Sequence, residues 1–482
     1  MTVKGFKRKF KEMKIISEEE VEYIHSSTID ILKEIGVKFD SKWAIKFFKA
    51  NDCLVDNNNI VRFPEGLVEE CIRRSPENFR VKAFKEKNDM VFNRDTVYFQ
   101  DAPGMNILDF NKKATRSPTK EEYIEYIKVL DSLPTVHGIS CYPYFGAKDI
   151  PPVMAIPELM AIKYKYTDKF HQCCYSNDSE IFCIKMAKAL GTETLGCIAS
   201  APPLSWDNSA VNQARRFVDA GFALGPVSGS NYGGTAPATI AGGIAKTNAE
   251  IISMLVLIQL LKPGHRCIMW RLDFPLNMRT GAPGFGQIGA SLGNAIFNQM
   301  WRYYRIPTGN STVGFINAKL PDFQSGYEKA LGAIISALSG GNLLQLHGGV
   351  MGELSAHPVQ AVLDEDIAGM VGKFISGVEV NEETIAFDLI KKVGPVPGHY
   401  LSTEHTRKWW KIAQFIPKSA DRTSNYKEWE SRGKKIAIDL AKERVTEILN
   451  SYNKKILNEE QIVKIDNILK EARQYYKEKD ML

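Results

Sequence analysis

Aromatic, amide and cationic side chains recur in this sequence where short apolar segments end. His347 closes one such segment, Leu343–His347 (LLQLH), and is followed by Gly348 and Gly349. A quaternary ammonium group is attracted to the faces of aromatic rings, and Arg271 or His347 could bind a carboxylate. The pattern predicts a ligand that carries a cation and an anion together, although packing in the core is the commoner role of any single aromatic residue. The candidate residues are Tyr142, Gln172, Trp206, Asn231, Tyr232, Trp270, Arg271, Asn310, Phe315, Gln345 and His347.

Other reaction types lack the residues that they need. Glycoside hydrolysis requires a pair of carboxylates, and few acids follow the apolar segments. No GxSxG sequence, the turn that carries the nucleophile of many serine hydrolases, is present. Lys319 follows an apolar segment and could form a Schiff base, although a solvated loop lysine is the commoner role. A lyase of the aldolase type that uses Lys319 therefore stays as an alternative.

Two further motifs resemble cofactor or metal sites. Residues 284–289 (GFGQIG) match GxGxxG, but no strand directly precedes them and no acid follows at the required distance. We interpret these glycines as a loop that closely approaches another part of the chain. His399, Glu404 and His405 could be assembled into a metal triad, yet neither HExxH nor HxH occurs. We predict neither a nicotinamide site nor a metal site.

Short apolar segments alternate with helical patterns through most of the chain, and these elements must position the candidate residues. Apolar residues at helical spacing predict helices at 248–261, 293–304 and 324–338, among others. Strands that alternate with helices form parallel β/α units, and about seven or eight such units fit a closed (β/α)8 barrel, whose mouth is lined by the carboxyl ends of the strands. The predicted strands are 136–142, 170–175, 195–201, 226–230, 267–272, 308–315 and 343–347.

Three regions follow from this alternation. Residues 1–100 are predicted to form an α/β appendage, which begins with an amphipathic helix after the capping box Ser17 to Glu20. Residues 101–427 form the predicted (β/α)8 barrel. Residues 428–482 are charged and helical, with a second capping signal from Asn458 to Gln461, and we expect them to pack outside the barrel.

Composition excludes several classes of protein. The 482 residues are 44% hydrophobic and 24% charged, and a formal net charge of +6 makes nucleic acid a poor candidate partner. Eight cysteines without CxxC spacing indicate reduced thiols in the cytoplasm. No signal peptide is visible, and the apolar stretch 251–261 is about half the length that crosses a bilayer. We expect a buried helix there and no membrane partner.

One long stretch of the sequence lacks acids. No Asp or Glu lies between Asp273 and Asp322, whereas surface helices normally carry both signs of charge. Much of this stretch should therefore be buried or lie in an interface. A subunit interface or the barrel interior explains it most simply, and a surface that receives a large ligand or a partner protein is the alternative. We expect a homo-oligomer.

Four separated blocks of the sequence carry a resemblance to a known family. They are 105–119 (MNILDFNKKATRSPT), 233–264 (GGTAPATIAGGIAKTNAEIISMLVLIQLLKPG), 317–329 (NAKLPDFQSGYEK) and 394–406 (GPVPGHYLSTEHT). In this order they resemble the trimethylamine:corrinoid methyltransferase superfamily, and the similarity runs from the N-terminal helix to about residue 422. The resemblance implies a (β/α)8 barrel that moves a methyl group from a methylated amine to the Co(I) centre of a separate corrinoid protein, so that no cofactor is bound tightly.

The resemblance also narrows the substrate. The founding trimethylamine enzymes carry pyrrolysine in the barrel, whereas this chain contains only standard residues. It is therefore similar to the pyrrolysine-free branch, whose substrates are quaternary amines such as glycine betaine, proline betaine, carnitine and γ-butyrobetaine. Methyl transfer from such an amine releases a neutral tertiary amine, so the protein must position the substrate and exclude water but needs no acid or base.

The leading hypothesis is a cytoplasmic quaternary-amine:corrinoid protein methyltransferase. His347 and Arg271 are the candidate carboxylate anchors. A non-catalytic betaine-binding protein and the lyase that uses Lys319 are the alternatives. The candidate cage residues for the ammonium group are Tyr142, Trp206, Tyr232, Trp270 and Phe315.

Overall fold

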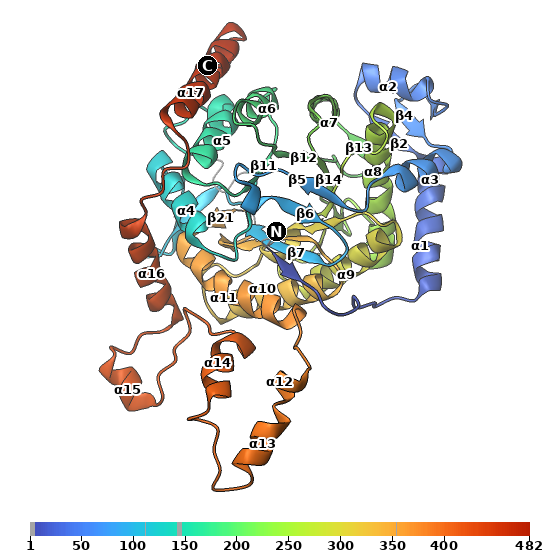
Figure 1. Ribbon diagram of the computed structural model, residues 1–482. Helices are drawn as coiled ribbons and strands as arrows, with labels where there is room; N and C mark the ends of the chain where they lie inside the picture. Colours follow the sequence, from blue (N-terminus) through green and yellow to red (C-terminus); the bar gives the residue numbers. More distant parts are fainter. Residues whose placement is uncertain (1–4, 111, 142–146, 353) are drawn as a thin grey trace.

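A closed ring of parallel strands forms the centre of the protein in a computed structural model that describes residues 5–110, 112–141, 147–352 and 354–482 (Figure 1). Around the ring the strand order is β7, β10, β11, β12, β14, β16, β18 and β19, and β19 pairs with β7 to close it. These barrel strands are β7 Thr96–Asp101, β10 Gly138–Ile139, β11 Phe170–Cys173, β12 Leu195–Ala199, β14 Leu224–Ser228, β16 Met269–Arg271, β18 Thr308–Asn310 and β19 Leu343–His347.

One helix of the outer layer follows each barrel strand, so the predicted (β/α)8 barrel is confirmed. Local sequence signals start several of these helices: Thr119 and Glu122 form a capping box at α4, and Asp322 and Ser325 form one at α10. The helices are α4 Lys120–Ser132, α5 Ala155–Tyr166, α6 Glu180–Ala189, α7 Asn208–Ala220, α8 Ile240–Leu261, α9 Ile288–Tyr303, α10 Phe323–Leu338 and α11 Pro358–Ile375.

The first barrel strand lies in the region that the sequence analysis assigned to the appendage. Strand β7 is Thr96–Asp101, and it follows the hairpin of β5 Phe79–Val81 and β6 Met90–Phe92. The hairpin side chains enter the amino-terminal end of the barrel and pack there against its strands. The β5–β6 hairpin and the barrel strand β7 have the same alternating apolar pattern. Periodicity alone therefore does not distinguish a hairpin that fills the end of the barrel from a strand of its wall.

The N-terminal region packs on the outside of the barrel. Its first helix begins after the predicted capping box of Ser17 and Glu20 and packs, with α3, against α8. Strand β1 Phe6–Lys7 pairs antiparallel with β7, and β2 pairs with β13 of the barrel region. The remaining elements of this region are α1 Glu18–Asp30, a π-helix Ile31–Ile35, α2 Lys42–Lys49, α3 Glu65–Arg74, β2 Val37–Phe39, β3 Leu54–Val55, β4 Ile60–Arg62 and β13 Ser205–Trp206.

Short strands extend the barrel beyond its carboxyl end. Strands β15 and β17 pair in parallel, and β20, β21, β8 and β9 form a small sheet. They connect barrel strands to the following helices and so lie at the mouth. Their bounds are β8 Asn106–Asp109, β9 Ala114–Arg116, β15 Asn231–Tyr232, β17 Phe274–Pro275, β20 Gly349–Val350 and β21 Ser355–Ala356.

Helix α8 contains the most apolar stretch of the chain. By length and composition it could cross a membrane, but 89% of its most apolar window is buried inside the protein. It packs against α1, α3, α7 and α9. The prediction of a buried helix over 251–261 is confirmed.

Residues after α11 leave the barrel, although the sequence analysis included them up to 427. Residues 378–413, which we call the arm, contain α12 Glu382–Ile385, α13 Phe387–Val393 and α14 Glu404–Ala413 and project away from the barrel (Figure 1). A second loop carries α15 Tyr426–Ser431. Helix α16 Ala437–Ser451 then packs on α4 and α11, and α17 Glu459–Glu478 packs on α5 and α6, as two helices outside the barrel.

Candidate functional site

The inner face of the barrel is identified by one apolar cluster. This cluster joins the β5–β6 hairpin to residues of several barrel strands, which only the barrel interior can bring together. Side chains alternate along a strand, so residues two positions further on also point inwards, nearer the mouth. The cluster residues on or beside the strands are Tyr98, Phe170, Leu195, Ala223, Val227, Ile268, Trp270 and Leu343.

Three amides form the inner face above this cluster. Alternation places Gln100, Gln172 and Gln345 inside, next after Tyr98, Phe170 and Leu343, and all three are buried. Gln100 Nε2 donates a hydrogen bond to Gln172 Oε1 at 2.9 Å. Gln100 Oε1 and Gln172 Nε2 have no partner among the described residues. A buried acceptor and a buried donor are therefore free to bind a ligand.

Three phenylalanines lie over the carboxyl end of the barrel. The ring centroids of Phe274 and Phe285 are 4.5 Å apart, and Phe315 lies 6.3 Å from each. Leu272 packs against this cluster and also against the interior cluster below it. Phe274 and Phe315 are buried and Phe285 is half-buried. Phe315 was predicted; Phe274 and Phe285 were missed, because they lie in the connection after β16 and not at a strand end.

Cysteines line the neighbouring part of the rim. The thiol of Cys141 is hydrogen-bonded to those of Cys174 and Cys197, and these bonds hold the pKa of Cys141 well below its usual range. The same contacts raise the pKa of the other two thiols. No group of three or more His, Cys, Asp or Glu residues within the described ranges could hold a metal ion.

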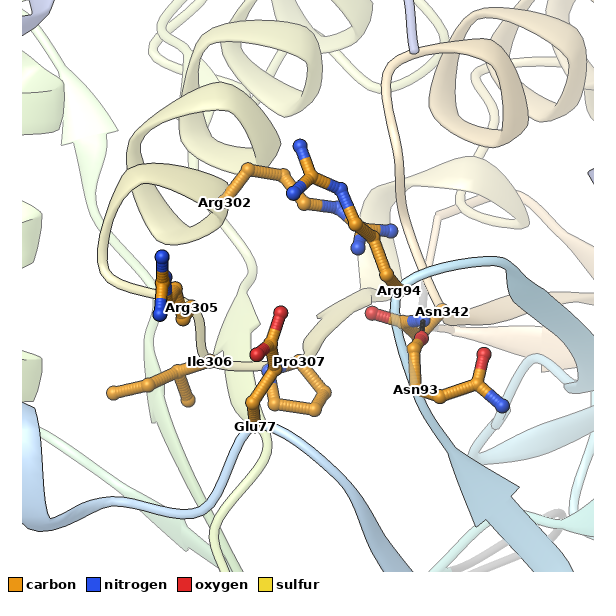
Figure 2. A pocket seen from close by; sticks show the side chains of 8 residues that line it. All are labelled: Glu77, Asn93, Arg94, Arg302, Arg305, Ile306, Pro307 and Asn342. Carbon is orange, nitrogen blue, oxygen red and sulfur yellow. Dashed lines mark hydrogen bonds between the residues drawn. The ribbon is translucent and has the colours of Figure 1, made fainter. Parts of the chain in front are cut away.

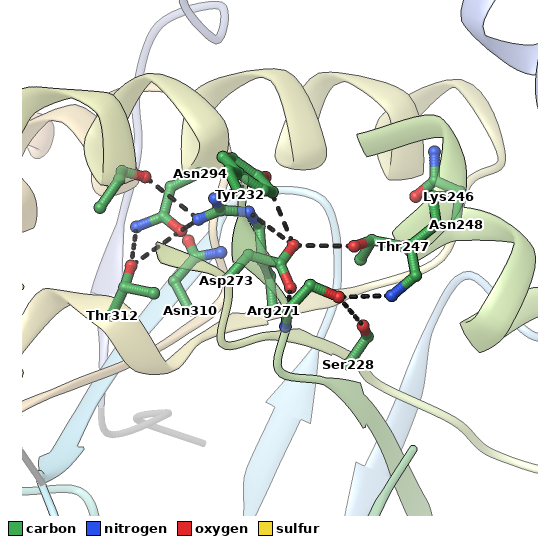
Figure 3. Close-up of polar contacts among 12 residues, drawn as sticks. Ser228, Tyr232, Lys246, Thr247, Asn248, Arg271, Asp273, Asn294, Asn310 and Thr312 are labelled. Carbon is green, nitrogen blue, oxygen red and sulfur yellow. Dashed lines mark hydrogen bonds and ion pairs between the residues drawn. The ribbon is translucent and has the colours of Figure 1, made fainter. Parts of the chain in front are cut away.

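Arg271 faces the outside of the barrel and not its mouth. It alternates with the inward Trp270, and its guanidinium lies between β16 and α9, where it donates to Ala290 O at 3.1 Å and to Asn294 Oδ1 at 2.9 Å (Figure 3). Its Nε lies 3.3 Å from Asp273, and both side chains are fully buried. The prediction that Arg271 binds a substrate carboxylate at the mouth is wrong, because Arg271 is already paired with the carboxylate of Asp273 behind the barrel wall.

Two other candidates belong to the same outer network. Tyr232 Oη accepts a hydrogen bond from Arg271 at 2.9 Å and lies 3.4 Å from Asp273, with its ring against Gly243 of α8. Asn310 exchanges hydrogen bonds with Asn298 of α9, at 3.0 and 3.1 Å. Both predictions of a place in the mouth are wrong, because the side chains fill the layer between wall and helices.

Further buried ion pairs lie in that outer layer. Lys329 of α10 donates to Asp364 of α11 at 2.7 Å and to the carbonyl of Leu346 at 2.8 Å. Lys246 and Glu250 of α8 form a second pair, and Glu250 also accepts from Ser228 at 2.6 Å. Burial raises the pKa of Asp364 and lowers that of Lys329. These pairs tie the carboxyl ends of the strands to the surrounding helices.

His347 is also turned outwards. The pairing of β19 with β7 is irregular between Gln345 and His347, so the normal alternation is broken there. The imidazole Nε2 lies 2.9 Å from Thr135 Oγ1, and the ring packs on the outward Phe99. Burial holds the pKa of His347 well below its usual range, so the ring is uncharged at neutral pH. The prediction of a cationic anchor at the mouth is wrong.

The remaining candidates divide between wall, rim and interior. Trp206 is buried against α8, where its Nε1 donates to the carbonyl of Glu250 at 3.2 Å, so it is not a cage residue. Trp270 lies inside the barrel but in the deep apolar cluster, between β14 and β18. Asn231 is half-buried on β15, beyond the barrel strands. Tyr142 lies outside the described residues.

Sequence reasoning missed an acid at the end of β7. Asp101 faces outwards next to the inward Gln100 and accepts hydrogen bonds from Ser140 N at 2.6 Å and Ser140 Oγ at 2.7 Å. Complete burial raises its pKa to about 6. Lys163 of α5 lies close by and donates to the carbonyls of Ser140 and Gln172, at 2.9 and 2.6 Å. Recognition of Thr96–Asp101 as a barrel strand would have revealed this group.

The surroundings of the glycine loop 284–289 do not suit a dinucleotide site, and those of Lys319 do not suit a Schiff base. A Cβ at Gly286 would overlap the carboxylate of Glu328, and Phe285 between the glycines reaches the aromatic cluster. The interpretation as a loop of close approach is therefore confirmed. Lys319 is exposed on the loop after Ile316, so desolvation cannot activate it as a Schiff-base amine.

A hollow at the opposite, amino-terminal end is too small for a substrate. It is lined by Arg94, Arg302 and Arg305 with Glu77 and Asn342, among others (Figure 2). Its volume is about 10 Å³, the space of about one water molecule. The carboxyl end, with its free amide groups and three rings, is the candidate site.

Comparison with known proteins finds a matching family model, similar sequences and a similar solved structure. The family model "Trimethylamine methyltransferase (MTTB)" matches residues 1–474. A glycine betaine methyltransferase of Desulfitobacterium hafniense (strain Y51) is 27% identical over 426 residues, which cover 86% of this chain and 88% of that protein. The trimethylamine methyltransferase MttB of Desulfitobacterium hafniense (strain DSM 10664 / DCB-2) is 27% identical over 478 residues, 95% of this chain and 94% of that protein. The crystal structure of the Methanosarcina barkeri monomethylamine methyltransferase superposes with a TM-score of 0.46 at 14% identity, covering 91% of this chain and 96% of that one.

Proposed function

The chain belongs to the trimethylamine methyltransferase (MTTB) family, and from this premise we propose that it transfers a methyl group from a quaternary amine to the Co(I) centre of a separate corrinoid protein. Glycine betaine and related betaines are the proposed substrates. The relative named glycine betaine methyltransferase supports this class, and so does a sequence made only of standard residues. Both Desulfitobacterium hafniense relatives are named methyltransferases.

The character of the inner face is the observation that carries the proposal. The inward residues near the mouth are amides, cysteines and apolar side chains, while Arg271, Asp273, Lys329 and Asp364 lie behind the wall. A substrate that brings its own positive charge fits a surface of amides and aromatic rings that holds no cation of its own. Methyl transfer from a quaternary amine releases a neutral tertiary amine, so it requires no general acid or base at this face.

We propose that Phe274, Phe285 and Phe315 contact the ammonium group. Their ring separations of 4.5 to 6.3 Å bring three π surfaces to one place at the rim. The leaving group is a neutral tertiary amine, so the charge on nitrogen falls as the methyl group departs. Rings that bound the cation too tightly would slow this step, and moderate cation–π attraction suits it.

The proposed anchor for the substrate carboxylate is the layer of amides, in place of Arg271 and His347. We propose that Gln172 Nε2, which lacks a partner among the described residues, donates a hydrogen bond to the substrate carboxylate. Gln100 holds Gln172 in place through the 2.9 Å hydrogen bond to its Oε1. An amide gives orientation without a fixed charge, and the binding energy then comes from a part of the substrate remote from the reacting methyl.

The corrinoid protein is proposed as a co-substrate that covers the mouth, and no tightly bound cofactor is proposed for this chain. Cobalt must come within bonding distance of the methyl group, so the partner has to approach the carboxyl end of the barrel. We also propose a cytoplasmic location, since all eight cysteines are free thiols. Self-association is proposed as well, because the stretch between Asp273 and Asp322 contains no acids, as in a subunit interface.

The direct test is to incubate the purified protein with a Co(I) corrinoid protein and a panel of betaines. We expect the methyl-Co(III) absorption spectrum to appear with one or more of them. A protein that binds betaine by calorimetry but never changes this spectrum would be a non-catalytic binding protein. Trapping of a substrate on Lys319 by borohydride would instead support the lyase, and either result would contradict the proposal.

A further inference from the structure

Three cysteines at the mouth differ from the other five in their exposure. Cys141 and Cys174 are each 9% exposed and Cys197 is half-buried, whereas the remaining cysteines are 5% exposed or less. Burial raises the pKa of Cys53 to about 12 and that of Cys71 to about 11, so thiols of this kind stay protonated and react slowly at neutral pH. The most exposed thiols of the chain therefore lie together, at the rim of the barrel.

Neighbouring strand ends bring these three thiols together. Cys174 follows the inward Gln172 by two positions on β11, and Cys197 follows the inward Leu195 by two positions on β12. Both side chains therefore point into the barrel. Cys141 lies two residues after β10, and its sulfur accepts hydrogen bonds from both of the other thiols. The result is a cluster of thiols on the inner face, at a surface that solvent reaches.

A buried cation lies behind this cluster. Lys163 of α5 is 1% exposed, and its Nζ donates to the carbonyl oxygens of Ser140 and Gln172 at 2.9 and 2.6 Å. It lies 3.5 Å from the carbonyl oxygen of Cys141. Hydrogen bonds from the other two thiols hold the pKa of Cys141 well below its usual range, and the charge of Lys163 lowers it further. Partly exposed thiols beside a lysine are the ones that act as nucleophiles in proteins.

The spacing of the strands decides which two thiols can form a disulfide. Continued by two residues, the pairing of β10 with β11 places Cys141 opposite Cys173 and one residue from Cys174. With a strand spacing of about 4.8 Å and a rise of about 3.3 Å, the Cα atoms of Cys141 and Cys174 lie about 6 Å apart, as in ordinary disulfides. Cys197 lies one strand further away, at about 9 Å, beyond the limit of about 7 Å for a disulfide.

We propose that Cys141 and Cys174 form a redox-active pair, which small disulfides oxidise to a reversible disulfide at the mouth. The thiolate of Cys141 attacks one sulfur of a small disulfide R–S–S–R, whose S–S bond breaks and releases one thiolate. The thiolate of Cys174 then attacks Sγ of Cys141 and releases the second. The protons of the two cysteines pass to the two released thiolates. The two cysteines are thus oxidised by two electrons, and R–S–S–R is reduced to two thiols RSH.

The effect of this disulfide on ligand binding rests on the proposed function. A bond of about 2.05 Å replaces a hydrogen-bonded contact between two sulfurs, so the ends of β10 and β11 draw together. Cys174 lies two residues after Gln172, and loss of the proposed hydrogen bond from Gln172 to the substrate carboxylate weakens binding about 10-fold to 100-fold. Co(I) is a strong reductant that oxidants consume. The disulfide therefore turns off the site under the conditions in which its methyl acceptor is absent.

The first test uses the full chain without substrate or corrinoid protein, so its outcome is independent of the proposed reaction. The native protein is treated with dithiodipyridine, a small disulfide whose product absorbs light. We expect rapid release of two equivalents of this product per chain, and peptide mass spectrometry should show Cys141 joined to Cys174. Dithiothreitol should restore both thiols. Slow release without this disulfide, or a different pairing such as Cys174 with Cys197, would overturn the proposal.

Three serine variants assign the roles of the thiols. Cys141→Ser removes the nucleophile, so release should be slower by about 10-fold or more, because hydrogen bonding to Cys141 and burial show that the other two thiols are the weaker acids. Cys174→Ser can still donate a hydrogen bond to Cys141 but lacks the second thiol, so one equivalent should be released and Cys141 should remain as a mixed disulfide. Cys197→Ser is the matched control and should still form the disulfide. Rapid release of two equivalents by Cys141→Ser would contradict the assignment.

Calorimetry then connects the pair with the site. We expect the oxidised protein to bind a betaine about 10-fold or more weakly than the reduced protein, and dithiothreitol should restore binding. Cys141→Ser should bind equally well with and without the oxidant. Equal binding by the oxidised and reduced wild type would overturn the role of the pair at the site. A reduced protein that binds no betaine would contradict the proposed function, whereas the disulfide is decided by mass spectrometry alone.

Discussion

The inner face of the barrel at its carboxyl end and the layer directly behind its wall differ completely in charge. Inside are Gln100, Gln172 and Gln345 with aromatic and aliphatic side chains. One side-chain alternation away, fully buried ion pairs join Arg271 to Asp273 and Lys329 to Asp364. The same strands thus separate the proposed binding surface of amides and aromatic rings from a highly charged supporting layer, and the two can be altered independently.

The difference shows where this barrel uses charge. Buried ions are costly to desolvate, and the four charged groups of these two pairs are also hydrogen-bonded to strand carbonyls, to backbone N–H groups or to polar side chains. Charge there holds the ends of strands and helices in register. The amides and rings of the inner face carry no charge, so the ammonium group of the proposed substrate meets dipoles and aromatic faces there, and it loses its charge in the reaction.

The largest effect is expected from breaking a pair in the outer layer. Lys329→Met leaves Asp364 buried without its cation, and removal of one partner of a buried pair costs about 3 to 5 kcal/mol. We expect the free energy of unfolding, measured in urea, to fall by this amount. The KM for a betaine should hardly change, since Lys329 does not reach the inner face.

The double variant Lys329→Met with Asp364→Asn is the control for this prediction. It removes both charges and keeps an acceptor for the Gly348 N–H, which Asp364 now binds at 2.8 Å. Its loss of stability should be clearly smaller than that of Lys329→Met alone. Equal losses would mean that the space filled by Lys329, and not its charge, stabilises the fold.

The next effect concerns Asp101, whose pKa burial raises to about 6 from 3.8. Because the folded protein holds this proton more tightly than the unfolded chain, the contribution of Asp101 to stability falls as pH rises from about 4 to about 6 and is level above that. The fall amounts to about 3 kcal/mol. Asp101→Asn lacks this titration, so its stability relative to wild type should increase by about that amount between pH 4 and pH 8.

Urea unfolding of both proteins at several pH values measures this difference and cancels the titration of all other groups. Ser140→Ala is the companion variant, because it removes the Oγ that donates to Asp101 at 2.7 Å and should raise the pKa of Asp101 further. A difference between wild type and Asp101→Asn that stays constant with pH would show that Asp101 keeps an ordinary pKa in the folded state.

The contrast between the two layers also explains what the sequence could predict. The alternation of strands and helices revealed seven of the eight barrel strands and the closed architecture, because β/α units have a clear period. Capping residues located helix starts such as that of α1 at Glu18. The direction of individual side chains was beyond this reasoning. Arg271 and His347 stand at strand ends as predicted, yet both point outwards.

The reasons for these two errors are specific. Arg271 lies next to Trp270, and the sequence does not show which neighbour faces inwards until the deep apolar cluster is known. His347 would face inwards by alternation from Gln345, but an irregular register with β7 turns it out. Phe285 was hidden in a glycine-rich loop, although glycines that allow close approach are a usable signal for such a residue.

On the inner face, Gln172→Glu tests the effect of placing a charge where the wild type has none. The new oxygen can still accept the hydrogen bond from Gln100 Nε2, but the N–H group that we propose donates to the substrate carboxylate is lost. A hydrogen bond to a charged group contributes about 1.5 to 3 kcal/mol, so the KM for a betaine should rise about 10-fold to 100-fold. Inhibition by tetramethylammonium, which has no carboxylate, should be unchanged or stronger.

The control is Gln213→Glu on α7, a fully buried glutamine of the outer layer. This variant should lower the free energy of unfolding. It should not weaken the binding of the betaine relative to that of tetramethylammonium. If Gln172→Glu weakened the binding of tetramethylammonium as much as that of the betaine, Gln172 would not contact the carboxylate, and the anchor would have to be sought elsewhere on the rim.

The smallest effect is expected at the aromatic cluster, where Phe285→Leu keeps apolar volume but removes one ring. Cation–π attraction contributes about 0.5 to 2 kcal/mol, so the KM for a betaine should rise about 2-fold to 30-fold. The turnover number should change less than KM does, or even rise, because the ring stabilises the charged substrate more than the transition state, in which charge on nitrogen is declining.

Phe92→Leu, in the apolar cluster at the other end of the barrel, is the matched control: it should lower the free energy of unfolding and leave KM unchanged. Similar KM values for both variants would place the ammonium group away from Phe285 and leave the ring with a packing role alone.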